Sequence, residues 1–324
     1  MSLGRTAALT DTGRKRRHNE DVYVVDPPIF AIADGMGGAN AGEVAAGLAA
    51  DALRGEGGRG EDAVVGLIQE ANRRVYQRAT EDAAASGMGT TMTVALLEDG
   101  RVRIGHVGDS RAYLIRDGEL AQLTDDHSLV GELVRSGKLT PEDAESHPQR
   151  SVITRALGTD PDVDVDTATV ETRAGDLFLL CSDGLYSMVG NDRILQLVER
   201  HRGNLDTAAK ALVAAANKGG GEDNITVVAF EIAGAEDETL REPAVPAERT
   251  PDEEDTLTEV DRVPAVTTMV VPPEEAETFA EREPEEREPE ERPAPPRPPL
   301  KVLAFLVLIL LAIAATIVVY LLAR

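Results

Sequence analysis

The stretch Ile29-Phe30-Ala31-Ile32-Ala33-Asp34-Gly35-Met36-Gly37-Gly38 decides how the chain is interpreted. It begins as a short apolar run, which predicts a buried strand. It then passes to a carboxylate followed at once by glycines. A carboxylate at the end of a buried strand is held rigidly, and glycines beside it let a ligand approach the backbone closely. We therefore expect Asp34 to belong to a site at the end of a strand.

The pattern around this stretch predicts short strands in runs and helices in pairs. We expect strands over residues 22–25, 29–33, 90–97, 102–107, 111–115, 120–124, 163–171, 176–181 and 224–232, and helices over 41–53, 62–84, 191–201 and 205–218. Asp99-Gly100 and Asp117-Gly118 are hairpin signals. Because strands and helices do not alternate one by one, the pattern favours an α+β fold with two antiparallel sheets packed together and helices outside.

Composition divides the chain into three parts. Residues 1–233 contain the periodic apolar pattern and are expected to form the folded domain. Residues 234–299 hold 13 of the 18 prolines and a net charge of −14, so we expect a disordered acidic linker. The whole chain carries a net charge of −25, which argues against a nucleic-acid partner.

Residues 300–323 are expected to form one transmembrane helix. The 22 residues from 302 to 323 carry no charge, and as a helix they would be about 33 Å long, enough to cross a bilayer. Three basic residues lie shortly before this segment and one after it, which predicts that the N-terminal domain is cytoplasmic. The single cysteine, Cys181, excludes an internal disulfide and suits a reducing compartment.

Four carboxylates share one local pattern, because each stands where an apolar strand ends or begins and beside small residues. They are Asp34, Asp109, Asp183 and Asp223, and Asp21 is a fifth candidate. Any one alone is typical of a turn. If they meet at one edge, they repel one another unless cations lie between them. An all-oxygen ligand set favours Mg²⁺ or Mn²⁺ over Zn²⁺, and water between two such ions becomes a nucleophile that hydrolyses phosphate esters.

Arg16 is the candidate for holding the substrate phosphate, because its planar guanidinium can bind two phosphate oxygens at once. The alternative is that Arg14-Lys15-Arg16-Arg17 is a solvated basic run. The residues alone leave both interpretations open.

Six motifs in this order resemble the metal-dependent Ser/Thr protein phosphatases of the PP2C (PPM) family, in particular bacterial membrane-anchored members. The motifs are Arg16-Arg17-His18-Asn19-Glu20-Asp21, Asp34-Gly35-Met36-Gly37-Gly38, Gly89-Thr90-Thr91, Val107-Gly108-Asp109-Ser110-Arg111, Ser182-Asp183-Gly184 and Glu222-Asp223-Asn224-Ile225-Thr226. The resemblance covers about residues 5–232 and implies a four-layer α/β/β/α sandwich.

The resemblance also implies roles for these residues in hydrolysing phosphoserine and phosphothreonine. Asp34 would bridge two Mn²⁺ or Mg²⁺ ions, and Gly35 would offer its carbonyl. Asp183 and Asp223 would be direct ligands, and Asp21 would act through water. Asp109 and Asp183 would hold a third ion, and Arg16 the phosphate. Residues 127–148 would form a flap beside the site, and the partners would be phosphorylated proteins, including a membrane Ser/Thr kinase.

The chain departs from some family members in one place, because its glycine run has no histidine to serve as general acid. Three other interpretations of the motifs are possible. A dinucleotide-binding loop fails because position 40 is Asn, and a cysteine phosphatase on Cys181 fails because position 187 is Ser. A non-catalytic phosphoprotein scaffold predicts the loss of a metal aspartate, and none is missing.

Overall fold

The computed structural model describes residues 2–37, 41–54, 60–145, 147–234 and 269–270. Two antiparallel sheets form the middle of the domain. The first has the strand order β1 (Ser2–Asp11), β12 (Ile225–Ala233), β11 (Leu177–Cys181), β7 (Arg111–Arg116) and β8 (Glu119–Gln122). The second has the order β10 (Asp166–Glu171), β6 (Arg101–Val107), β5 (Met92–Glu98), β3 (Ile29–Met36) and β2 (Asp21–Asp26), with β4 (Gly89–Thr90) paired to the end of β3.

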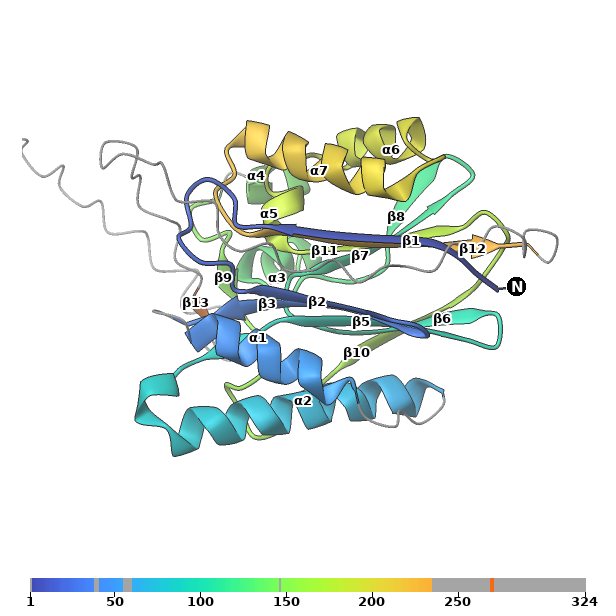
Figure 1. Ribbon diagram of the computed structural model, residues 1–324. Coiled ribbons are helices and arrows are strands. Elements are labelled where there is room, and N and C mark those ends of the chain that lie inside the picture. The colour runs from blue at the N-terminus through green and yellow to red at the C-terminus, as the bar shows by residue number, and fades with distance from the viewer. Residues whose placement is uncertain (1, 38–40, 55–59, 146, 235–268, 271–324) are drawn as a thin grey trace, which may run out of the picture. The chain divides into compact units, whose positions relative to one another are not determined.

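A helix pair covers the outer face of each sheet (Figure 1). The helices α1 (Ala41–Ala52) and α2 (Glu61–Glu81) pack on the second sheet, and α6 (Asn191–Arg200) and α7 (Leu205–Gly219) pack on the first. Each pair buries its apolar stripe against the sheet, as amphipathic helices do. The prediction of an α+β fold with two antiparallel sheets and flanking helix pairs is therefore confirmed.

A third apolar layer joins the two sheets. Phe230 of β12 stacks between Phe30 of β3 and Phe178 of β11, at ring-centroid distances of 4.1 and 5.1 Å. All three rings are buried. Because Phe30 belongs to the other sheet, this stack fixes how the two sheets face each other, and with them the strand ends that carry the predicted site.

The short elements lie in the connections. They are η1 (Ala83–Ala85), α3 (Leu129–Arg135), α4 (Pro141–Glu145), β9 (Val152–Ile153), α5 (Asp183–Tyr186) and β13 (Met269–Val270), of which β13 pairs in parallel with β9. Both hairpin predictions are confirmed, since Asp99-Gly100 and Asp117-Gly118 all have positive φ between antiparallel strands.

The sequence did not predict β1, which mixes Gly, Thr and Ala, lies at a sheet edge and is only half-buried. The strand expected over 90–97 is divided into β4 and β5. The division occurs at Thr91, whose backbone N–H donates to the Asp34 carbonyl at 2.9 Å instead of continuing one ladder.

Most of the predicted linker (234–299) and all of the predicted membrane span (300–323) lie outside the described residues. No helix in the described ranges is long and apolar enough to cross a bilayer.

Candidate active site

Asp21 and Asp34 lie directly opposite each other on the neighbouring strands β2 and β3. Cross-strand partners on one face are about 5 Å apart, so the pairing places two carboxylates side by side. Asp34 is fixed from behind by Thr91, whose hydroxyl accepts from the Asp34 backbone N–H at 3.0 Å. The backbone around Asp34 is thus held on both sides.

Asp21 also reaches across to the other sheet. One of its oxygens, Oδ2, accepts hydrogen bonds from the hydroxyls of Ser182 at 2.8 Å and Thr226 at 2.6 Å. Ser182 follows β11 and Thr226 lies in β12, so these bonds join the two sheets at the site. The carboxylate is 6 % exposed, and burial raises its pKa to about 6. Its second oxygen, Oδ1, has no hydrogen-bond partner among the described residues.

Asp183 and Asp223 come from the first sheet. Asp183 is the first residue of α5 and is separated from β11 by Ser182 alone, and Asp223 lies just before β12. Asp223 is oriented by two hydrogen bonds: the backbone N–H of Asn224 donates to its Oδ1 at 2.8 Å, and Arg16 Nη2 donates to its Oδ2 at 2.7 Å. Arg16 is therefore part of the acidic cluster, and the interpretation of Arg14–Arg17 as a wholly solvated run is wrong for this residue.

Asp109 follows the end of β6 and is 4 % exposed. Its backbone carbonyl accepts a hydrogen bond from the hydroxyl of Tyr186 at 3.0 Å. Tyr186 ends α5, the single turn that begins with Asp183, so this bond joins the segments that carry the two carboxylates. The guanidinium of Arg111 lies 3.6 Å from the centre of the Tyr186 ring, and Asp126 holds that guanidinium through three hydrogen bonds.

The turn before Asp109 is held by His127. The backbone N–H of Gly108 donates to His127 Nδ1 at 3.0 Å, and the backbone N–H of His127 donates to the Gly108 carbonyl at 2.7 Å. His127 also lies 3.1 Å from Asp166 through Nε2. Burial lowers the pKa of His127 to about 4, so the ring is neutral and Nδ1 accepts at neutral pH.

Gly35 is required by close approach of the backbone. A Cβ atom added there would lie 2.2 Å from the Gly42 carbonyl oxygen and 2.7 Å from the Glu20 carbonyl oxygen. No side chain fits between β3, α1 and the segment before β2. The residue after Asp34 is therefore held where only its backbone is available for binding.

The five carboxylates act on one another electrostatically. Burial raises the pKa of Asp34 well above its ordinary value, and the negative charges of the other four aspartates raise it further. Burial also raises the pKa of Asp183 well above its ordinary value and that of Asp109 to about 7. Such shifts mean that the cluster resists carrying its full negative charge unaided.

The donor set fits divalent cations that prefer oxygen. Three carboxylate oxygens, one each from Asp21, Asp109 and Asp183, are buried with no hydrogen-bond partner in the described part of the chain. Orphaned buried oxygens are costly unless something binds them. Within the described ranges no group of three or more acidic, histidine or cysteine side chains is close enough to hold a metal ion by itself. The residues thus fit Mn²⁺ or Mg²⁺.

The structure brings every predicted site residue to this one end of the sandwich through the contacts above. The quoted motifs contain Thr91, Ser182, Asn224 and Thr226, but their roles in holding the site residues were not predicted. Tyr186 was not singled out, and His127 was placed only at the start of the expected flap. Ser182 directly precedes Asp183, and Tyr186, Asn224 and Thr226 follow a site aspartate by one to three positions, so proximity in sequence was a usable signal for these four. Nothing in the sequence shows which oxygen each side chain binds.

A two-sheet sandwich with oxygen ligands at one end is the design of a metal-dependent phosphatase. The family model described as protein phosphatase 2C matches residues 16–216. The chain belongs to the protein phosphatase 2C family.

Several named relatives share this domain. The chain is 41% identical over 237 residues to the serine/threonine phosphatase stp of Listeria monocytogenes, covering 68% of this chain and 93% of that protein. It is 42% identical over 233 residues to PstP of Mycobacterium tuberculosis, covering 70% of this chain and 45% of that protein.

Solved structures agree. The crystal structure of M. tuberculosis PstP/Ppp matches with a TM-score of 0.68 at 40% identity, covering 72% of this chain and all of that one. The catalytic domain of PstP in complex with two manganese ions matches with a TM-score of 0.66 at 38% identity, covering 72% and 99%.

We predict that Mn²⁺ stabilises the protein more at about pH 7.5 than at about pH 5.5. These carboxyl groups have a higher pKa in the folded protein than in the unfolded chain, where it is about 4. They therefore stabilise the metal-free fold when they are protonated, and this stabilisation is lost as the pH rises through their pKa values in the folded protein. Mn²⁺ binds the deprotonated form, so its competition with protons weakens as the pH rises. Thermal unfolding with and without Mn²⁺ at both pH values measures this.

In that experiment Asp34→Asn should reduce the Mn²⁺-dependent shift in Tm at both pH values. A shift of equal size at both pH values in the wild-type protein would contradict the role of these raised pKa values in metal binding.

Proposed function

We propose that this protein hydrolyses phosphoserine and phosphothreonine in other proteins, using two Mn²⁺ or Mg²⁺ ions held by Asp34, Gly35, Asp183 and Asp223, with Asp21 acting through water. The single observation that carries this is the group of five aspartates beside Arg16, three of which have a buried carboxylate oxygen with no hydrogen-bond partner among the described residues. The named Ser/Thr phosphatases among the relatives support the substrate class.

The chain's own residues divide the work by position. Asp34 and Asp183 keep part of their surface exposed, so they face the solvent from which substrate and ions arrive. Asp21 is held by two hydroxyl donors and cannot swing away from the site. When bound, the two ions supply an acidified water and polarise the phosphate. Arg16 binds phosphate oxygens and stabilises the charge that the transferred group carries.

The rival function, a phosphoprotein-binding scaffold without catalysis, is tested by turnover of the full chain on p-nitrophenyl phosphate with Mn²⁺. We expect Mn²⁺-dependent hydrolysis. Asp34→Asn should lower kcat by more than about 100-fold, because loss of a direct metal ligand costs more than loss of a residue that only hydrogen-bonds to a ligand.

Arg16→Ala should raise KM about tenfold or more, because a charge-assisted hydrogen bond to the phosphate is lost. Arg78→Ala, on the exposed face of α2, is the matched control. Absence of Asp34-dependent turnover would support the scaffold.

A third ion held by Asp109 and Asp183 is part of the proposal. The Tyr186 hydrogen bond keeps the segments of these two residues together, and each residue has one partnerless buried oxygen among the described residues. We predict that Asp109→Asn removes the weakest of three Mn²⁺ binding steps in calorimetry and lowers kcat, with the two tighter steps retained. Three unchanged steps, or an unchanged kcat, would exclude the third site.

The catalytic domain is further proposed to be cytoplasmic and tethered to the cell membrane through residues 234–299 and a span at 300–323, where it meets a membrane Ser/Thr kinase among its phosphorylated partners. The 22 uncharged residues from 302 to 323 and the basic residues before them support this. We predict that the full chain stays in the membrane fraction after alkaline carbonate washing, and that a variant ending at residue 299 is released. Release of the full chain by the wash would refute the anchor.

A further inference from the structure

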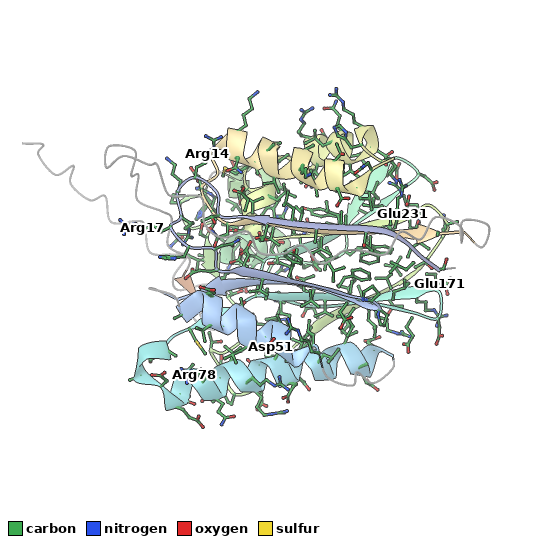
Figure 2. The ribbon with its side chains drawn as sticks, in the orientation of Figure 1. Arg14, Arg17, Asp51, Arg78, Glu171 and Glu231 are labelled. Atoms are coloured by element: carbon green, nitrogen blue, oxygen red, sulfur yellow. The ribbon has the colours of Figure 1, made fainter. Side chains whose placement is uncertain are left out.

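The basic run Arg14-Lys15-Arg16-Arg17 lies in the loop between β1 and β2, and its arginine side chains point in different directions. Arg16 turns inward and binds Asp223. Arg14 and Arg17 are exposed, and Figure 2 shows both projecting from the same end of the domain. Among the described residues neither has an ion-pair partner. Two free guanidinium groups thus flank the one that is engaged in the site.

This loop is held rigidly, so its charges stay beside the site. The side-chain amide of Asn224 donates to the carbonyls of Thr12 and His18, both at 3.0 Å, and so clamps the two ends of the loop. The backbone N–H of Arg14 donates to the Gly221 carbonyl at 2.7 Å. The loop is therefore attached to the segment that carries Asp223.

Glu20 lies in the loop itself and acts electrostatically on Arg16 and His18, and three other acidic side chains around the loop have partners. Asp223 binds Arg16, and Glu222 pairs with Arg150 at 3.4 Å. The Asp11 carboxylate accepts hydrogen bonds from the Gly13 backbone N–H and from Asn217. The positive charge of Arg14 and Arg17 is therefore directed outward, in a chain whose net charge is −25.

We propose that Arg14 and Arg17 select phosphoprotein segments with acidic residues next to the phosphorylated residue. This rests on the proposed function, in which the phosphate is bound by Arg16. Consecutive Cα atoms are about 3.8 Å apart, so Arg14 and Arg17 lie within about 8 Å of Arg16 along the loop. Residues one to three positions from the phosphate in an extended peptide lie about 3 to 10 Å away. These two backbone spacings are of the same size, so an Asp or Glu that flanks the phosphate comes within reach of the long side chain of Arg14 or Arg17 when Arg16 binds the phosphate.

The test uses the full chain with Mn²⁺ and two phosphothreonine peptides that differ only in their flanks, Asp and Glu in one and Asn and Gln in the other. Each exposed ion pair contributes about two- to fivefold in affinity. We expect kcat/KM to favour the acidic peptide by about fivefold or more, and the preference to shrink in high salt because the charges are exposed. Residues 234–299 are identical in every variant and compete equally with both peptides.

The double substitution Arg14→Gln with Arg17→Gln should bring the ratio of the two kcat/KM values close to one, and Arg78→Gln should leave the wild-type ratio. Both loop side chains are exposed, and an unchanged Tm would show that the fold is kept. A wild-type ratio near one, or the same ratio in the double variant as in the wild type, would overturn the proposal. If the wild-type protein hydrolysed neither the acidic nor the neutral peptide, the proposed function would be overturned, and this inference with it.

Discussion

The hydrogen bonds from Ser182 and Thr226 to Asp21 are the interaction on which the site depends. They run from one sheet to the other at the end of the sandwich that carries the five aspartates. Negatively charged carboxylates repel one another more strongly when they are buried than in water. Here the aspartates come from both sheets, so their repulsion tends to separate the two sheets at this end. Two hydroxyl donors on a single carboxylate oxygen oppose it. The apolar layer around Phe230 holds the two sheets together elsewhere, but it provides no hydrogen bonds that could fix the positions of the aspartates.

The cluster therefore stores unfavourable electrostatic energy that a cation relieves. Burial raises the pKa of Asp34 and of Asp183 well above the ordinary value for a carboxyl group, and the charges of neighbouring aspartates raise both further. The fold tolerates them because each stands at a strand end or on a one-turn helix whose backbone is fixed independently. Thr91 holds Asp34, and the α5 turn holds Asp183. Rigid backbone under mutually repelling side chains is a preorganised cation site.

The strands, the hairpins and the positions of the aspartates were predictable from the sequence, because each is set by residues close together in the chain. The strand ending at Asp34 has a five-residue apolar run, and the two Asp-Gly hairpins carry their turn signal in two residues. What the sequence could not provide lies in contacts between distant residues. Ser182 and Thr226 are 161 and 205 positions from Asp21. Nothing in the sequence around them indicates that their hydroxyls bind that carboxylate. The half-buried edge strand β1 was missed for a related reason: its residues show no clear alternation, and pairing with β12 stabilises it.

Asn224 connects a predicted metal ligand to the basic loop. Its backbone N–H orients Asp223, while its side-chain amide holds both ends of the basic loop and its Oδ1 accepts from the backbone N–H of Glu20. One residue thus sets the position of a predicted metal ligand, of Arg16 and of the exposed arginines beside it. Since Glu20 in turn accepts from the Gly35 backbone N–H, the same chain of hydrogen bonds continues to the glycine after Asp34. The basic loop, Asp223 and the glycine after Asp34 are therefore positioned by one connected set of hydrogen bonds.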